Sequence, residues 1–300
     1  MADRVAGRVA IRPDPALAAA GGPLPAGALT RFAPAPTGYL HLGHVANAIV
    51  VWALARSTGG RVLLRLEDHD RQRCRPEFEE PLIEDLAWLG FEADAGSVRQ
   101  SDDGTPYATA VEALRADGLI YGCDCSRATF RSWALRAGRS WTGPGCPGGC
   151  RDRGVAGPVW RVAIGGGTET WQDAALGPRS GDVVVPGGDL PVRDRHGQWT
   201  YGLCVVVDDL RQGIGLVVRG QDLLDATAGQ IRLGQLLGRA APPTFFHHPL
   251  IRRPDGSKLS KSSGDTGVRE LRAAGWSAEA VVEAAGSALA AARSSSGRPG

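Results

Sequence analysis

Residues 31–44 read RFAPAPTGYLHLGH, and this stretch sets the architecture that we expect for the chain. The apolar run 28–34 ends in proline, as a short strand does where it gives way to a turn. Thr37 and Gly38 supply turn residues, and apolar residues then recur at helical spacing from His44 onward. We therefore predict a strand, a turn and a helix in this order, which is the start of an α/β fold.

The alternation of strand and helix continues after residue 60. RVLLRL at 61–66 predicts a strand with an acidic end, and 77–89 has the apolar spacing of a helix closed by Gly90. Two such units in sequence predict a parallel, Rossmann-type sheet. The other predicted elements are a helix at 107–119, short strands at 159–164 and 183–185, a buried strand at 201–208 (YGLCVVVD), and helices at 222–237, 268–273 and 278–292.

Charge and hydropathy exclude several classes of protein. Lys and Arg total 34 against 32 Asp and Glu, so any contact with nucleic acid needs a local basic patch. No apolar run approaches the roughly 20 residues that span a bilayer. The first 30 residues also lack the continuous apolar segment of a secretory signal. We therefore expect a cytoplasmic protein with no membrane partner.

Two histidines and a glycine stand where the first helix is expected to begin. His41 and His44 fall on one side of the first turn, and Gly43 has no side chain to keep a flat ring away from the backbone. A helix N-terminus attracts phosphate through its unpaired N–H groups. The pattern is typical of a nucleotide site, and an ordinary helix start that carries histidines is the alternative.

A second polar element, GSKLSKS, occupies residues 256–262. The ammonium groups of Lys258 and Lys261 could follow a triphosphate there, although a loop of this composition is more commonly a solvated basic surface. Together and in this order, the histidine motif and the lysine loop favour a nucleotide site over an ordinary helix start and a solvated basic surface.

Four of the six cysteines form two close pairs, Cys123 with Cys125 and Cys146 with Cys150. Four thiolates suit tetrahedral Zn²⁺, and four protein ligands leave no open position, so such a metal would be structural. Two disulfides or free cysteines are the alternatives. The arginines around the cluster, which form a basic patch, are Arg127, Arg131, Arg136, Arg139, Arg151 and Arg153. This patch either contacts RNA phosphate or is an ordinary solvated surface.

With these motifs in place, the chain resembles a known family. Residues 31–44 and 258–262 are similar to the HIGH and KMSKS signatures of class I aminoacyl-tRNA synthetases, and the segments LEDHD (66–70), YGLCVVVDD (201–209) and VRGQDLL (218–224) narrow the resemblance to the glutamyl branch. The resemblance implies that L-glutamate and ATP, with Mg²⁺, give glutamyl-adenylate and pyrophosphate. It implies ATP-binding roles for His41, Gly43, His44, Lys258 and Lys261, of which the histidines and lysines would be catalytic.

The resemblance also implies a glutamate pocket. Arg31 and Arg219 would pair with substrate carboxylate, which suits a planar guanidinium. Glu67 would meet the ammonium group, and the Tyr201 hydroxyl would orient the substrate. The implied glutamate-binding residues are Arg31, Phe32, Ala33, Pro34, Ala35, Glu67, Tyr201 and Arg219, with Ala35 where the family commonly has Ser. Taken singly, the arginines could be surface residues at strand ends, Glu67 could pair with Arg65 or Arg71, and Tyr201 could be core.

The expected acceptor follows from the residues after Ser262. A full glutamyl-tRNA synthetase continues there with an anticodon-binding region longer than the remainder of this chain. The chain is therefore similar to the truncated glutamyl-Q tRNA(Asp) synthetases, which transfer glutamate to queuosine in tRNA(Asp). That group carries a zinc site at this place, typically with Tyr where this chain has Cys146.

Two alternatives remain for the function. One is a glutamyl ligase of the same fold with another acceptor, such as a different tRNA, an amine or a thiol. The other is a non-catalytic, zinc-stabilised RNA-binding module. We expect a monomer in either case. The predicted parts are a flexible tail (1–28), the first half of a Rossmann catalytic domain (29–120), a zinc-binding and connecting insertion (121–200), the second half with the KLSKS loop (201–262), and a helical C-terminal segment with a disordered tail (263–300).

Overall fold

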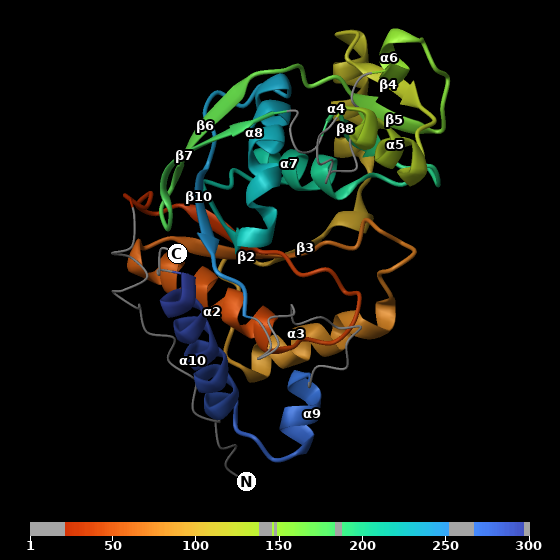
Figure 1. Ribbon diagram of the computed structural model, residues 1–300. Coiled ribbons are helices and arrows are strands. Elements are labelled where there is room, and N and C mark those ends of the chain that lie inside the picture. Colours follow the sequence, from red (N-terminus) through yellow and green to blue (C-terminus); the bar gives the residue numbers. More distant parts are fainter. Residues whose placement is uncertain (1–21, 138–145, 147–148, 184–187, 252–266, 297–300) are drawn as a thin grey trace.

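A computed structural model describes residues 22–137, 146, 149–183, 188–251 and 267–296. A larger sheet carries helices on both faces, and a smaller sheet lies beyond one end of it (Figure 1). In these residues the larger sheet has the strand order β3 (Ser97–Arg99), β2 (Arg61–Leu66), β1 (Leu29–Phe32), β9 (Leu216–Gly220), β10 (Thr244–His248), β6 (Thr168–Asp173) and β7 (Gly177–Asp182).

Parallel pairing dominates the larger sheet. β1 pairs with β2, Arg31 opposite Leu63, and on its other side β1 pairs with β9, which pairs with β10. The strand order therefore reverses between β1 and β9, which is where open α/β sheets bind ligands. The predicted α/β fold with a Rossmann-type parallel sheet is confirmed, and the strand predicted at 61–66 has those bounds.

A hairpin from the predicted insertion also joins this sheet. β6 pairs with β10 in parallel, Asp173 opposite Phe245, and β7 pairs with β6 in antiparallel. The Trp171 ring is buried against Phe245, with ring centroids 6.4 Å apart, so the hairpin shares the core of the sheet. The strand predicted at 183–185 lies largely outside the described residues, and the predicted domain boundaries stay a prediction.

Helices cover the two faces of the sheet and enclose separate cores (Figure 1). Trp52 and Leu82 lie in the core beneath α2, α3 and α10, and Tyr107 and Leu203 lie in the core beneath α4, α7 and α8. The helix bounds are α2 (Leu42–Ser57), α3 (Glu79–Trp88), α4 (Thr105–Ala116), α5 (Arg127–Ala137), α6 (Gly149–Asp152), α7 (Tyr201–Arg211), α8 (Thr227–Leu236), α9 (Val268–Ala273) and α10 (Ala278–Ser296), with 3₁₀ turns η1 (Pro76–Phe78), η2 (Gln100–Asp102) and η3 (Gln221–Ala226).

The strand predicted at 201–208 is wrong, because this segment is the helix α7. Every residue from Leu203 to Asp209 is buried, so the segment has no solvent face to reveal a helical period. Its valines favour strands by intrinsic propensity, but packing against α4, α8 and β8 overrides that preference. The helix has a functional consequence, since it brings Tyr201 and Asp209 within about 12 Å along its axis at 1.5 Å per residue.

The smaller sheet is antiparallel and consists of β4 (Ile120–Cys123), β5 (Val159–Val162) and β8 (Leu190–Arg193). Together with α5 and α6 it surrounds a very small core, in which Cys123, Cys146, Cys150 and Val159 are buried. Val162 of β5 and Val192 of β8 lie instead in the larger core with Tyr107 and Leu203. The cysteine-bearing end of the sheet has only the small core, which supplies little hydrophobic stabilisation, so this end needs another source of stability. Among the residues described, no helix has the length and apolar character that crossing a membrane requires.

One carboxylate in α3 predicts a pH effect on stability. Asp85 is buried, its Oδ2 has no hydrogen-bond partner among the described residues, and burial raises its pKa to about 6. Because the folded pKa exceeds the unfolded value, the wild type loses stability as the pH rises from about 4 to 6. We expect Asp85→Asn to raise the free energy of unfolding by about 2 kcal/mol at pH 8 and not at pH 4.

Urea unfolding at the two pH values measures this effect. Glu80→Gln is the matched control, since Glu80 lies on the same helix, is exposed and does not contribute to the raised pKa of Asp85. An equal gain from Asp85→Asn at pH 4 and pH 8 would contradict the assignment, because it would not depend on ionisation.

Candidate active site

Strand alternation brings the predicted glutamate residues to one face of the sheet. Phe32 packs against Trp52 on the α2 face, with ring centroids 5.5 Å apart, so the side chain of Arg31 points to the α7 face. The Phe32 ring is therefore core and lies away from the pocket. The Glu67 N–H donates to the Pro34 carbonyl at 3.0 Å, which joins the chain just beyond the ends of β1 and β2.

Two of the arginines on this face are neutralised by the protein itself. Arg31 Nε donates to Asp209 Oδ1 at 3.0 Å, and Arg65 Nη1 donates to the same oxygen at 2.8 Å. Arg65 Nη2 donates to Glu67 Oε1 at 3.0 Å, so the pairing of Glu67 with Arg65 is confirmed. Burial alone would raise the pKa of Asp209, but the two arginines hold it below its usual range. Burial also opposes the charge of Arg65, yet the surrounding carboxylates raise its pKa.

Tyr201 begins α7 and lies among the same groups. Burial raises the pKa of its phenol, and the charges that act on it are those of Glu67, Arg219, Arg31 and Asp209. These groups come from β1, the residue after β2, β9 and α7. They are therefore close enough to influence one another's charge at the carboxyl ends of three strands. The structure brings together all four side chains that the sequence assigned to substrate charge and orientation.

Arg219 differs from the other two arginines because its partners are uncharged. Its Nε donates to His247 Nε2 at 3.0 Å, and its two terminal nitrogens donate to Gln230 Oε1 at 2.6 Å and Thr227 Oγ1 at 2.8 Å. Among the described residues no carboxylate forms an ion pair with it. Burial accordingly lowers the pKa of Arg219, and only 5% of the residue is exposed. A buried cation without a counter-charge is unfavourable unless an anion arrives.

His247 connects Arg219 to a second layer of support. His247 Nε2 accepts from Arg219, so the ring proton is on Nδ1, which donates to Asp173 Oδ2 at 2.5 Å. Burial lowers the pKa of His247 in spite of this bond, which keeps the ring neutral. The hydrogen bonds from Asp173 through His247 to Arg219 fix the plane of the guanidinium, but they place no carboxylate in direct contact with it.

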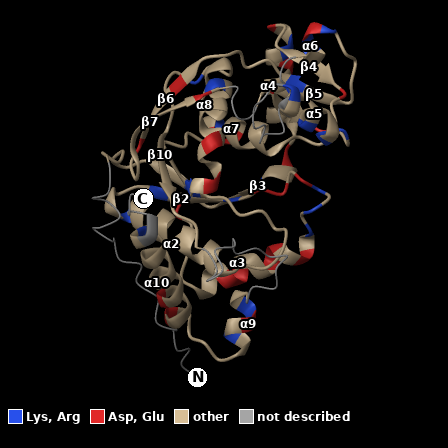
Figure 2. Ribbon diagram, viewed as in Figure 1, with Lys and Arg blue, Asp and Glu red and all other residues tan. Residues whose placement is uncertain are grey.

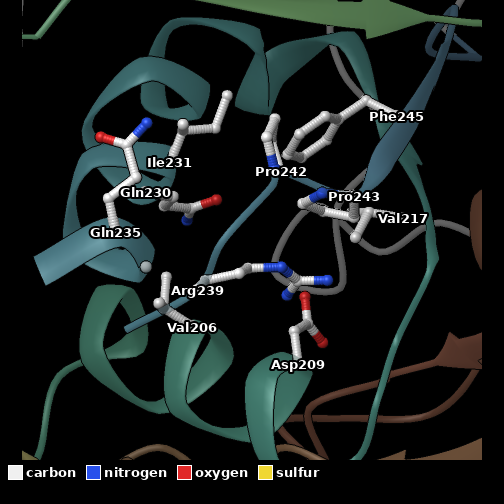
Figure 3. Close-up of a pocket in the computed structure, with 11 residues that line it drawn as sticks. Val206, Asp209, Val217, Gln230, Ile231, Gln235, Arg239, Pro242, Pro243 and Phe245 are labelled. Atoms are coloured by element: carbon white, nitrogen blue, oxygen red, sulfur yellow. The ribbon is translucent and has the colours of Figure 1, made fainter. Parts of the chain in front are cut away.

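A small cavity lies beside the residues that hold Arg31 and Arg219 (Figure 3). It has a volume of ≈ 30 Å³, and the residues that border it include Asp209 and Gln230, which hold Arg31 and Arg219. Figure 3 shows the Arg239 guanidinium pointing toward the Asp209 carboxylate. This volume has room for about one water molecule, so the cavity belongs to the support of the site and is too small for a substrate.

The histidine motif forms the N-terminus of α2. His41 Nδ1 accepts from the Gly43 N–H and His44 Nδ1 accepts from the His41 N–H, both at 3.1 Å. The two rings therefore cap the helix and keep their protons on Nε2, away from the helix backbone. They border a cavity of ≈ 250 Å³ that also includes Asn47 and His248, whose Nε2 lies 3.1 Å from Asn47 Oδ1. This arrangement presents N–H donors and a helix dipole to an anion.

Lys258 and Lys261 lie outside the described residues. The residues on either side are described: Ile251 borders the cavity at His44, and Gly267 pairs with His41 through an isolated bridge. The described residues on either side of the gap 252–266 therefore lie beside the histidine motif. The catalytic and ATP-binding roles of the two lysines stay predictions.

The four cysteines of the two pairs lie together. The sulfur atoms of Cys123, Cys125, Cys146 and Cys150 are all within 4.8 Å of one another. None of them is in a disulfide, and the Cys125 and Cys150 sulfurs are 3.3 Å apart, too far for a bond. Burial raises the pKa of the Cys125 and Cys150 thiols, so a set of thiolates here needs a cation. The donor set fits a tetrahedral metal ion.

Basic residues surround this cluster (Figure 2). The arginines of the predicted patch that the structure describes, all of them exposed, are Arg127, Arg131, Arg136, Arg151 and Arg153. Arg139 lies outside the described residues. Two of these arginine charges are partly offset by carboxylates. Arg151 Nε lies 3.5 Å from Asp152 Oδ1, and Arg153 Nη2 lies 3.9 Å from Asp124 Oδ1. A contact of this patch with RNA stays a prediction.

Sequence reasoning missed several residues that hold the pocket. Arg65 was considered only as a possible partner of Glu67, although an arginine within the apolar strand RVLLRL is rarely buried without partners. Asp209 was missed because the residues before it, 201–208, were predicted to form a strand and not the helix that carries it. Asp173 and His247 are 74 residues apart in sequence, and nothing in the sequence pairs them.

Comparison with known proteins agrees with this geometry. Residues 28–137 and 180–288 match the family described as tRNA synthetases class I (E and Q), catalytic domain. A protein of Bordetella bronchiseptica named glutamyl-Q tRNA(Asp) synthetase is 45% identical over 240 residues, which cover 78% of this chain and 75% of the relative. A protein of Symbiobacterium thermophilum with the same name is 41% identical over 271 residues, which cover 84% and 83%.

A solved structure shows the same fold. The glutamate tRNA ligase of Elizabethkingia meningosepticum, in complex with its amino acid, superposes with a TM-score of 0.66 at 27% identity. The match covers 80% of this chain and 53% of the ligase, so the chain spans about half of that protein.

These matches define the class of protein: the chain belongs to the class I tRNA synthetases of the E and Q family, through their catalytic domain. Within that family, both relatives described above, which the chain matches over 75% and 83% of their length, are named glutamyl-Q tRNA(Asp) synthetase.

Proposed function

We propose that this chain activates L-glutamate with ATP in the absence of tRNA and then transfers the glutamyl group to queuosine in the anticodon of tRNA(Asp). The observation that carries the activation step is the buried Arg219, a cation with uncharged partners beside Arg31, Glu67 and Tyr201. A glutamate side-chain carboxylate would supply the missing counter-charge, with a bidentate geometry that guanidinium favours.

The activation step needs no protein nucleophile. The substrate α-carboxylate attacks the α-phosphate of ATP, and pyrophosphate leaves with the electron pair of the broken P–O bond. Arg219 binds the side-chain carboxylate of glutamate. Glu67 accepts a hydrogen bond from Arg65 at Oε1, and its negative charge stabilises the substrate ammonium group. His41 and His44 donate from Nε2 to phosphate oxygens, and Lys258 and Lys261 follow the charge that develops on pyrophosphate. Alignment and charge stabilisation are the sources of the rate.

The acceptor in this proposal rests on the relatives. Those named glutamyl-Q tRNA(Asp) synthetase are similar to this chain over 75% and 83% of their length, whereas the match covers 53% of the solved glutamate tRNA ligase. We propose Zn²⁺ for the four-cysteine site, because an all-thiolate tetrahedral set is typical of structural zinc. The expected cytoplasmic location, the monomeric state and the requirement for Mg²⁺ stay predictions.

Pyrophosphate exchange tests the activation step. Metal-loaded protein is expected to exchange labelled pyrophosphate into ATP with glutamate and without tRNA, and to discriminate against aspartate, which is one methylene too short to reach Arg219. Absence of exchange with any amino acid would overturn the enzymatic proposal. Transfer of labelled glutamate to tRNA(Asp) with and without queuosine then tests the acceptor, and equal labelling would exclude queuosine.

His41 allows its capping and phosphate-binding roles to be separated. Asn is among the best helix N-caps, so His41→Asn is expected to keep the melting temperature while it loses the Nε2–H donor. Loss of one donor to developing charge costs about 100-fold in the rate of exchange. His41→Ala is the comparison, since it removes the cap as well and is expected to lower both the rate and the melting temperature. An unchanged rate in His41→Asn would show that the ring acts only as a cap.

A further inference from the structure

A hydrogen-bond chain leads from the buried interior to His69 at the edge of the pocket. Asp208 is fully buried in α7 and accepts hydrogen bonds from the Tyr107 hydroxyl at 3.0 Å and from Arg211 Nε at 2.7 Å. Gln100 Nε2 donates to the same carboxylate at 2.7 Å. The Gln100 side chain, only 2% exposed, then places its Oε1 at 2.8 Å from His69 Nδ1.

This chain determines the tautomer of His69. The Asp208 carboxylate acts here as an acceptor, so Gln100 must face it with its NH₂ group. Gln100 Oε1 is then an acceptor as well, and His69 Nδ1 must carry the ring proton. The neutral His69 ring therefore has its lone pair on Nε2, for which no hydrogen-bond partner is found among the described residues.

His69 lies next to the proposed glutamate pocket. It follows Glu67 by two residues beyond the end of β2, and its ring centroid is 6.2 Å from that of Tyr201. The residue is half-buried, in contrast to the buried Gln100 that orients it. His69 therefore borders the pocket on the side of Tyr201.

A cavity lined by three arginines and by the carboxylates of Asp68 and Glu79 lies beside Asp68, the residue before His69. It measures ≈ 360 Å³, and Arg71, Arg75 and Arg99 contribute to its lining together with Asp68 and Ser101. The Ser101 N–H donates to Asp68 Oδ1 at 2.8 Å, which ties the neighbours of Gln100 to those of His69. Basic segments on the loop between β2 and α3 are visible in Figure 2. Each of these arginines has an acidic neighbour, since Arg71 pairs with Asp68, Arg75 with Glu77 and Arg99 with Glu79. The side chains of Arg71 and Arg75 are exposed, so their guanidinium groups can turn toward a phosphate of the acceptor.

We propose that His69 is the general base of the transfer step, which rests on the function proposed above. Its Nε2 takes the proton of an acceptor hydroxyl on a nucleic acid whose phosphate lies in the arginine-lined cavity. The hydroxyl oxygen forms a bond to the carbonyl carbon of glutamyl-adenylate. The bond from that carbon to the phosphate oxygen breaks, and AMP leaves with its electron pair. The proton on Nε2 then passes to solvent, which regenerates the neutral ring.

The two half-reactions separate this role from activation. We expect His69→Gln to keep glutamate-dependent pyrophosphate exchange within about twofold of wild type. In the same variant, the single-turnover rate of transfer from preformed glutamyl-adenylate to queuosine-containing tRNA(Asp) is expected to fall about 100-fold, as for loss of a general base. The dissociation constant for the tRNA is expected to stay unchanged. In His69→Gly, added imidazole is expected to restore part of the transfer rate.

A second histidine provides the control. His196 is exposed in the turn before α7, and His196→Gln is expected to leave exchange and transfer at wild-type rates. Wild-type transfer in His69→Gln, or an equal fall in exchange and transfer without imidazole rescue, would overturn the assignment. Failure of the wild type itself to exchange or to transfer would instead contradict the proposed function, so the two failures are distinguishable.

Discussion

Arg219→Gln is expected to abolish glutamate activation while the folded chain stays as stable as the wild type or becomes more stable. In the wild type, Arg219 is 5% exposed and its guanidinium has hydroxyl, amide and imidazole partners, with no carboxylate partner in the part of the chain that the structure describes. Removing an uncompensated buried charge relieves the cost of its desolvation, so the melting temperature is not expected to fall. The substrate carboxylate, however, would then be buried without a partner, at a cost of about 3 to 5 kcal/mol.

This cost corresponds to a fall of at least about 100-fold in kcat/KM for glutamate in pyrophosphate exchange. Arg179→Gln is the matched control, because Arg179 is an exposed arginine of β7 and is expected to change neither quantity. A large fall in melting temperature with unchanged exchange would contradict the prediction. That outcome would make Arg219 a structural cation like Arg65, which has carboxylates around it.

The second large effect is expected at the four-cysteine site. Wild-type protein is expected to hold one zinc ion per chain, and Cys150→Ser to hold none. The small core around Cys123 and Val159 would then lack its main stabilising interaction, since structural zinc contributes about 10 kcal/mol or more to the folding of small domains. Amide hydrogens at the cysteine-bearing end of the smaller sheet, around Cys123 and Val159, are expected to lose protection. Those of β1, β9 and β10 are expected to keep it, because their side chains belong to the larger cores.

Metal analysis together with hydrogen exchange measures this effect. Cys74→Ser is the control, because Cys74 is a half-buried thiol outside the cluster and its loss is expected to leave the zinc content unchanged. Treatment of the wild type with a chelator is expected to reproduce the Cys150→Ser pattern. Full protection of the smaller sheet in metal-free protein would show that the ion is not needed for folding.

The parts of the site that could be predicted are those that depend on residues close together in the sequence. RFAPAPTGYLHLGH contains a strand end, a turn and a helix start within one short segment, so its geometry follows from neighbouring residues. The cysteine pairs are equally local, and the structure brings all four sulfurs together. The resemblance then supplied Arg31, Glu67, Tyr201 and Arg219, which the structure places at one end of the sheet.

The residues that hold this pocket could not be predicted in the same way. Asp209 accepts from Arg31 across 178 residues and from Arg65 across 144 residues, and the position of α7 alone makes both bonds possible. The misassigned helix shows the same limit, since a segment buried on all sides loses the period that identifies it.

The sequence by itself therefore determined the α/β class, the two signature segments and the four thiols, because periodicity, turn residues and close spacing are properties of neighbouring residues. Only the tertiary structure decided which arginine lacks a counter-charge. The sequence alone does not show which of Arg31 and Arg219 has a charged partner. Asp209 approaches Arg31, whereas Thr227, Gln230 and His247 surround Arg219, and burial makes that difference in partners a difference in affinity for an anion.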